Sequence, residues 1–235
     1  MLWQKEMQVW GALCLGTLVV VLNPGLSLRR WRFFTAPGMT FNSSDASNTF
    51  NVSYPCECKA LCLINQTCLA WTAEMRAEAW SCLHATKGPL LTPSLTNNSA
   101  AVYGFTEDSL TGVINVVQKE DQLHYFVPNM RVTTTQAGRG NCSKIPGFRL
   151  AMLKTEQQQS IGKALAAQAG SALRMDIVVI ANKTYWGDGT PYSGQVIGVA
   201  LTNMTLIISN LGITSSMLWP APYFLCQGNH VDLIE

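Results

Sequence analysis

The sequence predicts an α+β protein built from short strands, a few helices and disulfide bonds. Five of the eight cysteines lie between positions 56 and 82, a density typical of a disulfide framework. Short apolar runs such as 113–117 and 123–127 indicate β-strands. The segment 155–168 instead carries apolar residues on one helical face behind a capping threonine.

The composition favours a folded, exported protein over a nucleic-acid binder. Of 235 residues, 48% are hydrophobic and 13% are charged, whereas about a quarter of an average chain is charged. Such a composition argues against a long disordered tail, and glycans are the expected source of solubility. The formal net charge is +2 and the densest basic cluster is Arg29, Arg30 and Arg32, so no nucleic-acid partner is expected.

Residues 1–27 have the features of a secretory signal peptide. An apolar run from Val9 to Leu22 ends at Pro24-Gly25. It is shorter than the roughly 20 residues that a membrane-spanning helix needs, although an uncleaved signal anchor remains an alternative. A later apolar stretch, 196–213, is interrupted by polar residues and is interpreted as core strands. We therefore expect a secreted, extracellular protein with no membrane span after cleavage.

Acceptor triplets for N-glycosylation support export independently. Each Asn-x-Ser/Thr site that is used must lie on the surface. A seventh triplet, at Asn141, has Cys142 in its middle position and is less suited to modification. The six expected glycosylation sites are Asn42, Asn51, Asn65, Asn97, Asn182 and Asn203.

The cysteine cluster predicts disulfides in preference to a metal site. Zinc would need two separated pairs of ligands, and the only histidine nearby is His84. In an oxidising compartment thiols pair instead. Removing Cys14 with the signal peptide leaves seven cysteines, so at least one is expected to lack an intramolecular partner.

The spacing within the cluster suggests how it pairs. Cys58 and Cys62 are four residues apart and share one face of a short helix that begins after Pro55. Runs 68–72 and 80–83 are expected to form a hairpin beside that helix. Pairing Cys62 with Cys68 and Cys58 with Cys82 would fasten the helix to the hairpin.

This first unit resembles a PAN/apple domain. The resemblance rests on Cys58-x-Ala60-x-Cys62, on the Cys68-Leu69-Ala70-Trp71 strand and on Ser81-Cys82-Leu83. It covers residues 28–106 and implies a small sheet with one helix across it, acting as a protein- or glycan-binding module without catalytic residues. Cys56 departs from the pattern, so it is the expected unpaired or intermolecular thiol.

A second unit is expected at 113–235, after a polar linker at 107–112. Its helix begins behind Thr155, with Gln158 three residues later completing a capping box. A buried strand at 177–181 follows, then a wide aromatic turn at 185–191 and a closing strand at 219–226.

The second unit resembles a degenerate C-type lectin-like domain. The resemblance rests on the order of Cys142, the Phe148–Ala151 strand, the following helix, the Trp186–Pro191 turn and the Tyr223–Gln227 ending. It implies a long-range disulfide between Cys142 and Cys226. The inner disulfide of the family is missing.

The calcium-binding triplets of that family are also missing. No Glu-Pro-Asn or Gln-Pro-Asp triplet is present, and 193–219 contains no Asp or Glu. Calcium takes six to eight oxygen ligands, several of them carboxylates. We therefore expect no metal and no cofactor.

Sugar or peptide binding is expected instead at the aromatic turn. Exposed aromatic rings there can stack against a ligand. Asp188, flanked by glycines, resembles an exposed catalytic carboxylate. The alternative for Asp188 is a turn-capping role. The candidate ligand-binding residues are Tyr185, Trp186, Asp188 and Tyr192.

These observations predict a secreted glycoprotein for extracellular recognition or adhesion, for example in innate immunity. It would bind carbohydrate or protein without the family's usual calcium site. The alternative is a structural or interaction protein that forms a disulfide-linked homodimer through Cys56 and binds a protein partner. No pair of catalytic acid and base residues, nucleophile motif or phosphate loop is present, so an enzyme is not expected.

Overall fold

The computed structural model describes residues 33–91, 95–198, 204–216 and 221–228. Within these ranges the fold is mostly β-sheet with a few helices and several disulfides, an α+β protein. None of the helices in these ranges combines the length and apolar character needed to cross a bilayer. The expected signal segment, 1–27, and Asn203 lie outside the described residues.

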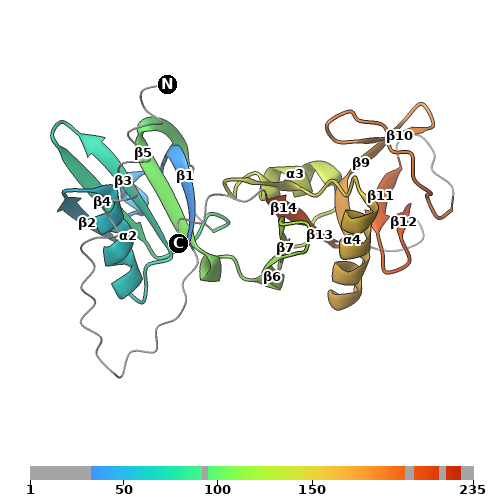
Figure 1. Cartoon of the computed structure of the whole chain (residues 1–235), viewed down its shortest axis with the longest axis horizontal. Helices are drawn as coiled ribbons and strands as arrows, with labels where there is room; N and C mark the ends of the chain where they lie inside the picture. The colour runs from blue at the N-terminus through green and yellow to red at the C-terminus, as the bar shows by residue number, and fades with distance from the viewer. Residues whose placement is uncertain (1–32, 92–94, 199–203, 217–220, 229–235) are drawn as a thin grey trace.

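The N-terminal part, residues 33–106, forms one antiparallel sheet (Figure 1). The strand order of this first sheet is β1-β5-β3-β4-β2. Strand β4 is buried over most of its length because both faces of the sheet are covered. The elements are β1 (Phe33–Thr40), η1 (Ser43–Asp45), β2 (Asn48–Val52), β3 (Ala70–Arg76), β4 (Ala79–Ala85) and β5 (Thr96–Thr106).

Helix α2 (Pro55–Ile64) covers one face of the first sheet and is fastened to it by two disulfides. Cys58 bonds to Cys82 on β4, and Cys62 bonds to Cys68 just before β3. All four cysteines are fully buried. These are the two pairs that the helical spacing predicts.

Cys56 is not a free thiol. It is disulfide-bonded, and its partner lies outside the described residues. The prediction of an unpaired or intermolecular Cys56 is therefore wrong. The prediction rested on the odd number of cysteines left after removal of Cys14 and on a departure from the family pattern, and neither observation fixes the pairing of Cys56.

The C-terminal part, residues 112–228, contains two further sheets. The second sheet has the order β6-β7-β14-β8, and the third has the order β10-β9-β11-β12 with β13 pairing parallel to β9. The strands are β6 (Gly112–Gln118), β7 (His124–Pro128), β8 (Phe148–Leu150), β9 (Leu173–Ile180), β10 (Lys183–Trp186), β11 (Thr205–Ile208), β12 (Ile213–Ser215), β13 (Tyr223–Phe224) and β14 (Cys226–Gly228).

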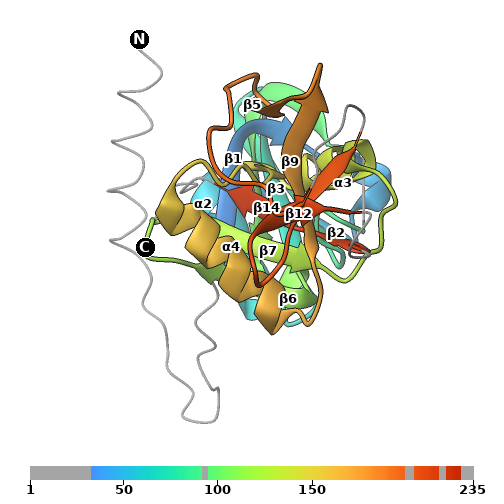
Figure 2. The same cartoon turned by 90° about the vertical axis from the view of Figure 1, so that its right-hand side faces the viewer.

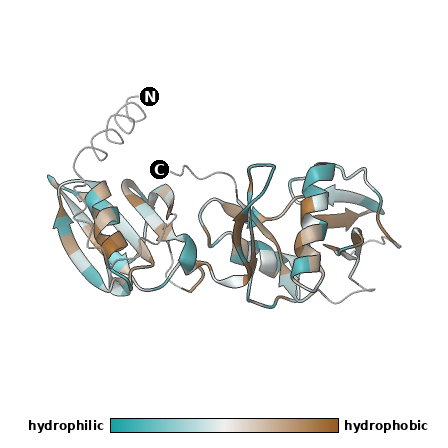
Figure 3. Cartoon of the chain, turned by 60° about the horizontal axis from the view of Figure 1, so that its bottom comes forward, coloured by the Kyte–Doolittle hydropathy of each residue, from teal (hydrophilic) through white to brown (hydrophobic). Residues whose placement is uncertain are grey.

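Helix α4 (Glu156–Gln168) packs on the third sheet, and Figure 2 shows it lying across the strands of the C-terminal part. Hydrophobic and hydrophilic residues alternate along the helix (Figure 3), and its buried residues share the face that meets the sheet. The predicted capping box is present, since the Thr155 side chain accepts from Gln158 N–H and the Gln158 side chain reaches back. Ile161 and Leu165 are buried against the sheet.

Helix α3 (Thr135–Cys142) ends at the third disulfide. Cys142 bonds to Cys226 on β14, as the lectin-like resemblance implies. Gly138, on the same helix, faces Leu150 of β8 and Phe224 of β13. The helix is therefore held against both sheets of the C-terminal part.

The N- and C-terminal parts meet in a shared hydrophobic core, and each part also has a cluster of its own. Phe34 of β1 stacks on Phe105 at 5.2 Å and meets the rings of His124 and Phe148 edge-on at 5.5 and 5.9 Å. Phe126 joins the same cluster from β7. The face of the first sheet opposite α2 is therefore covered by the C-terminal part, which fixes the two parts against each other.

The segment expected to be a linker, 107–112, contributes Leu110 to this shared core, while Asp108 and Thr111 are exposed. It contains the short helix η2 (Glu107–Ser109), capped by the Thr106 side chain. Leu110 is 1% exposed and belongs to the shared core. The division of the chain into two independent domains therefore remains a prediction.

Candidate binding groove

The two aromatic residues of strand β10, Tyr185 and Trp186, lie on opposite faces of the third sheet. Successive side chains of a strand alternate between faces. Trp186 lies opposite Ile177 on the face that packs against α4, and it is 3% exposed. The expectation of an exposed Trp186 is wrong, because the strand extends through position 186 where the sequence suggested a turn. Tyr185 points to the other face, where it is partly exposed.

Tyr192 completes the packing around Trp186. Their rings meet edge-on at 5.4 Å, and the Tyr192 hydroxyl donates to the Gln195 carbonyl at 3.0 Å. Burial raises the pKa of Tyr192. A Cβ at Gly194 would lie 2.3 Å from the hydroxyl, so a larger residue there would displace the Tyr192 ring. Tyr192 thus fastens its own loop to the core.

Asp188 organises the turn after β10. Its carboxylate accepts from the Thr190 N–H at 3.1 Å and the Thr190 hydroxyl at 2.7 Å, and it forms an ion pair with Lys154. The hydrogen bond from Lys154, followed by those from Thr190, holds the pKa of Asp188 well below its usual range. These contacts match the turn-capping alternative for this residue.

An open groove of about 750 Å³ lies on the face of the third sheet that α4 leaves uncovered. Tyr185 and Thr205 flank Val178 on either side as its partners in neighbouring strands. Ile180, two residues further along β9, is 59% exposed. We call Val178, Ile180 and Tyr185 the apolar strip of the groove.

Arg139 lines the groove and is held by an ion pair with Asp176. Arg139 of α3 donates from Nε and Nη2 to Oδ1 of Asp176, at 2.8 and 2.5 Å. The Asp176 side chain is 13% exposed and that of Arg139 is 36% exposed. A ligand in the groove would therefore meet a guanidinium already oriented by its partner.

Of the four predicted ligand-binding residues, Tyr185 and Trp186 line this groove, Trp186 as a buried residue, whereas Asp188 and Tyr192 do not. Arg139 and Asp176 are far apart in sequence, and only the packing of α3 on β9 brings them together. One signal pointed to Asp176: it is the one carboxylate inside the apolar strand 173–180.

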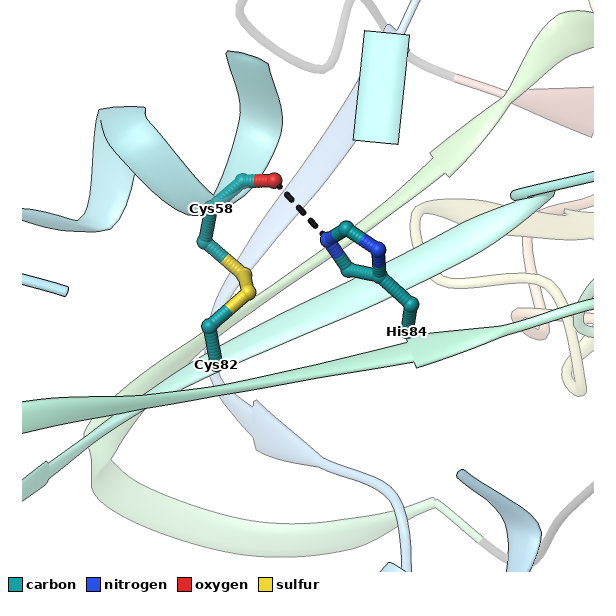
Figure 4. A group of neighbouring side chains, drawn as sticks. All are labelled: Cys58, Cys82 and His84. Carbon is teal, nitrogen blue, oxygen red and sulfur yellow. Dashed lines mark hydrogen bonds between the residues drawn. A yellow bond between two sulfur atoms is a disulfide. The ribbon is translucent and has the colours of Figure 1, made fainter. Parts of the chain in front are cut away.

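The described residues contain one group of cysteine, histidine or acidic side chains close enough to hold a metal, and it is occupied by a disulfide. Cys58, Cys82 and His84 lie together beneath α2 (Figure 4). Both sulfur atoms are bonded to each other, whereas metals bind the free thiolate. Nε2 of His84 lies 3.1 Å from the Cys58 carbonyl oxygen, and burial lowers the pKa of this imidazole.

The predicted glycosylation sites that the structure describes are accessible. Asn42, Asn51, Asn97 and Asn182 are exposed, and Asn65 is partly exposed. Asn65 also accepts hydrogen bonds from the Thr67 N–H and hydroxyl. Of these sites, Asn182 lies at the turn between the two strands that carry the apolar strip.

Comparisons with known proteins identify no family. Neither the protein-family models nor the curated proteins contain a match. Among solved structures, one described as "SPL-1 - GlcNAc complex" is similar with a TM-score of 0.37 and 9% identity. The similarity covers 45% of this chain and 86% of that one. Similarity this weak carries no conclusion about fold or function.

Proposed function

We propose that this chain is an extracellular recognition protein, without catalytic activity, that binds carbohydrate in the groove without calcium. The observation that carries the proposal is the apolar strip placed beside the Arg139–Asp176 pair. Recognition sites typically combine apolar walls with a few placed polar groups. Sugar rings have an apolar face suited to Tyr185 and hydroxyls suited to a guanidinium and a carboxylate.

The disulfides support an extracellular location. Three lie between described cysteines, and such bonds persist mainly in oxidising compartments. The signal-like segment 1–27 and the acceptor triplets point the same way. The PAN/apple and C-type lectin-like resemblances remain part of this proposal.

Protein binding is the second candidate, and the exposure of Ile180 favours it. An isoleucine that is 59% exposed beside Val178 gives the groove an apolar rim of the kind that protein partners cover. Covalent dimerisation through Cys56 no longer supports this alternative, since that cysteine is already bonded.

The test is binding of the secreted chain to an array of glycans and microbial surfaces, with calcium and again with a chelator. We expect chelator-resistant binding that Val178→Arg and Tyr185→Ala weaken by about tenfold or more. Ile64→Arg is the matched control, because Ile64 is 79% exposed on α2, outside the groove. Binding that disappears in chelator, or that both groove variants leave unchanged, would overturn the proposal. Binding to proteins alone would favour the second candidate.

A further inference from the structure

The tip of the β9–β10 hairpin combines an acceptor triplet with the rim of the groove. Ile180 pairs with Lys183, so Ala181 and Asn182 form a two-residue turn. Their φ angles are 47° and 61°, the left-handed values of a type I′ turn. Asn182-Lys183-Thr184 is an Asn-x-Thr triplet, and Asn182 is exposed.

The same hairpin carries the apolar strip. Val178 and Tyr185 are direct partners, as are Ile180 and Lys183, and all four side chains share the groove face. Ile180, the most exposed of the three strip residues, is two residues before the acceptor asparagine. Together with Val178 and Tyr185 it forms a contiguous apolar surface, which is the kind of surface that a cover or a partner buries.

An N-linked glycan suits this position as a cover. Its first sugar is N-acetylglucosamine, which has an apolar ring face and an acetamido methyl group that can pack on aliphatic and aromatic side chains. Asn182 is two residues after Ile180 and three before Tyr185, so a sugar attached to it is tethered beside both side chains. A tethered sugar packs on them without the entropy cost that a free sugar would pay on binding. The glycan is transferred before folding, so the tight turn does not hinder its addition.

We propose that Asn182 is glycosylated and that its glycan covers Ile180, forming the hairpin-side wall of the groove. The glycan then limits which ligands can enter the groove, and this part of the inference rests on the proposed function. Its covering of Ile180 is independent of any external ligand.

The first experiment establishes occupancy in the full chain secreted by eukaryotic cells. Asn182→Gln and Thr184→Val each remove the triplet, whereas Thr184→Ser preserves it. We expect the first two variants to lose the mass of one glycan and the third to keep it. Equal masses for all three and for the unmodified sequence would refute the proposal at its first step.

The second experiment measures the cover without a ligand, through the fluorescence of anilinonaphthalene sulfonate. We expect Asn182→Gln to raise the dye signal by about twofold or more, since it uncovers Ile180. Adding Ile180→Ser should abolish the increase, and Asn97→Gln, which removes a triplet from β5, should not produce one. An unchanged signal in Asn182→Gln, or an increase that persists with Ile180→Ser, would overturn the proposal.

The glycan array then separates this inference from the proposed function. If the groove binds sugars, Asn182→Gln should bind a wider set than the unmodified chain. Absence of any array binding would count against the proposed function, while the mass and dye results would still decide whether the glycan covers Ile180.

Discussion

The Asp176 carboxylate lies against the backbone of Gly187. A Cβ at position 187 would come within 2.1 Å of that carboxylate, and the Gly187 N–H donates to the Asp176 carbonyl at 2.9 Å. The absence of a side chain at 187 therefore sets where the carboxylate sits and where it meets Arg139.

Gly187→Ala should consequently disturb both stability and the groove. We expect the free energy of unfolding to fall by about 1–3 kcal/mol, because the carboxylate must move from its ion pair. Gly140→Ala is the control, since a Cβ there meets nothing within 4 Å and alanine favours a helix. Chemical denaturation checks both variants. Equal stability of the two would contradict the close approach of Asp176 and Gly187.

His84 makes the stability depend on pH. Burial lowers the pKa of its imidazole below the ordinary 6.5, and the hydrogen bond with Cys58 opposes this only in part. Below about pH 6.5 the unfolded chain therefore binds more protons than the folded chain. The free energy of unfolding should then decrease as the pH falls through this range toward the lowered pKa.

The variant His84→Gln removes that proton and should flatten the pH dependence. A glutamine amide can still donate to the Cys58 carbonyl, although the changed packing should cost about 1–3 kcal/mol at neutral pH. Urea denaturation at about pH 7.5 and about pH 5 gives the comparison. Asn48→Gln, opposite His84 in the sheet, should keep the original slope. The same slope in both variants would show that His84 does not contribute.

The three disulfides between described cysteines should differ in the stability they contribute, in the order of the loops they close. The sequence separations are 84 for Cys142–Cys226, 24 for Cys58–Cys82 and 6 for Cys62–Cys68. Loop-closure entropy gives about 4.5, 3.5 and 2 kcal/mol respectively. Replacing each pair by alanines and measuring unfolding by denaturant tests this order. A larger loss for the shortest loop than for the longest would point to native packing, and not chain entropy, as the main term.

The sequence predicts features that depend on local spacing and misses those that depend on sheet register. The Cys58 and Cys62 pairings and the Thr155 cap follow from helical periodicity within a few residues. The burial of Trp186 does not, because it depends on how far β10 extends and on its pairing with Ile177. A shift of one residue would exchange the positions of Tyr185 and Trp186.

The sequence does not predict the groove, for the same reason. Its charged pair joins α3 to β9, and nothing in the local sequence fixes that packing. The burial of Leu110 is also not predicted. Its polar sequence neighbours suggest a linker, whereas in the structure Leu110 is part of the shared core. Long-range contacts decide both cases, and a single sequence gives no measure of them.

Phe34 provides a test of whether the two parts of the chain unfold together. It contacts Phe105 within the first sheet and His124 and Phe148 in the C-terminal part. Because the cluster around Phe34 contains residues of both parts, we expect a single cooperative thermal transition in which the calorimetric and van't Hoff enthalpies agree.

Phe34→Ala should destabilise this one transition by about 3–5 kcal/mol, because Phe34 is 1% exposed and its removal leaves a cavity between the sheets. Phe50→Ala, at a site 38% exposed on β2, should cost much less. Scanning calorimetry distinguishes the outcomes. Two separate transitions in the unmodified chain, with Phe34→Ala lowering only the one that belongs to the first sheet, would mean that the parts fold as independent domains despite their contact. A single transition whose midpoint temperature falls in Phe34→Ala would mean that the folding of the groove depends on the first sheet. The second sheet connects them, because it carries part of the shared core and also packs against the third sheet.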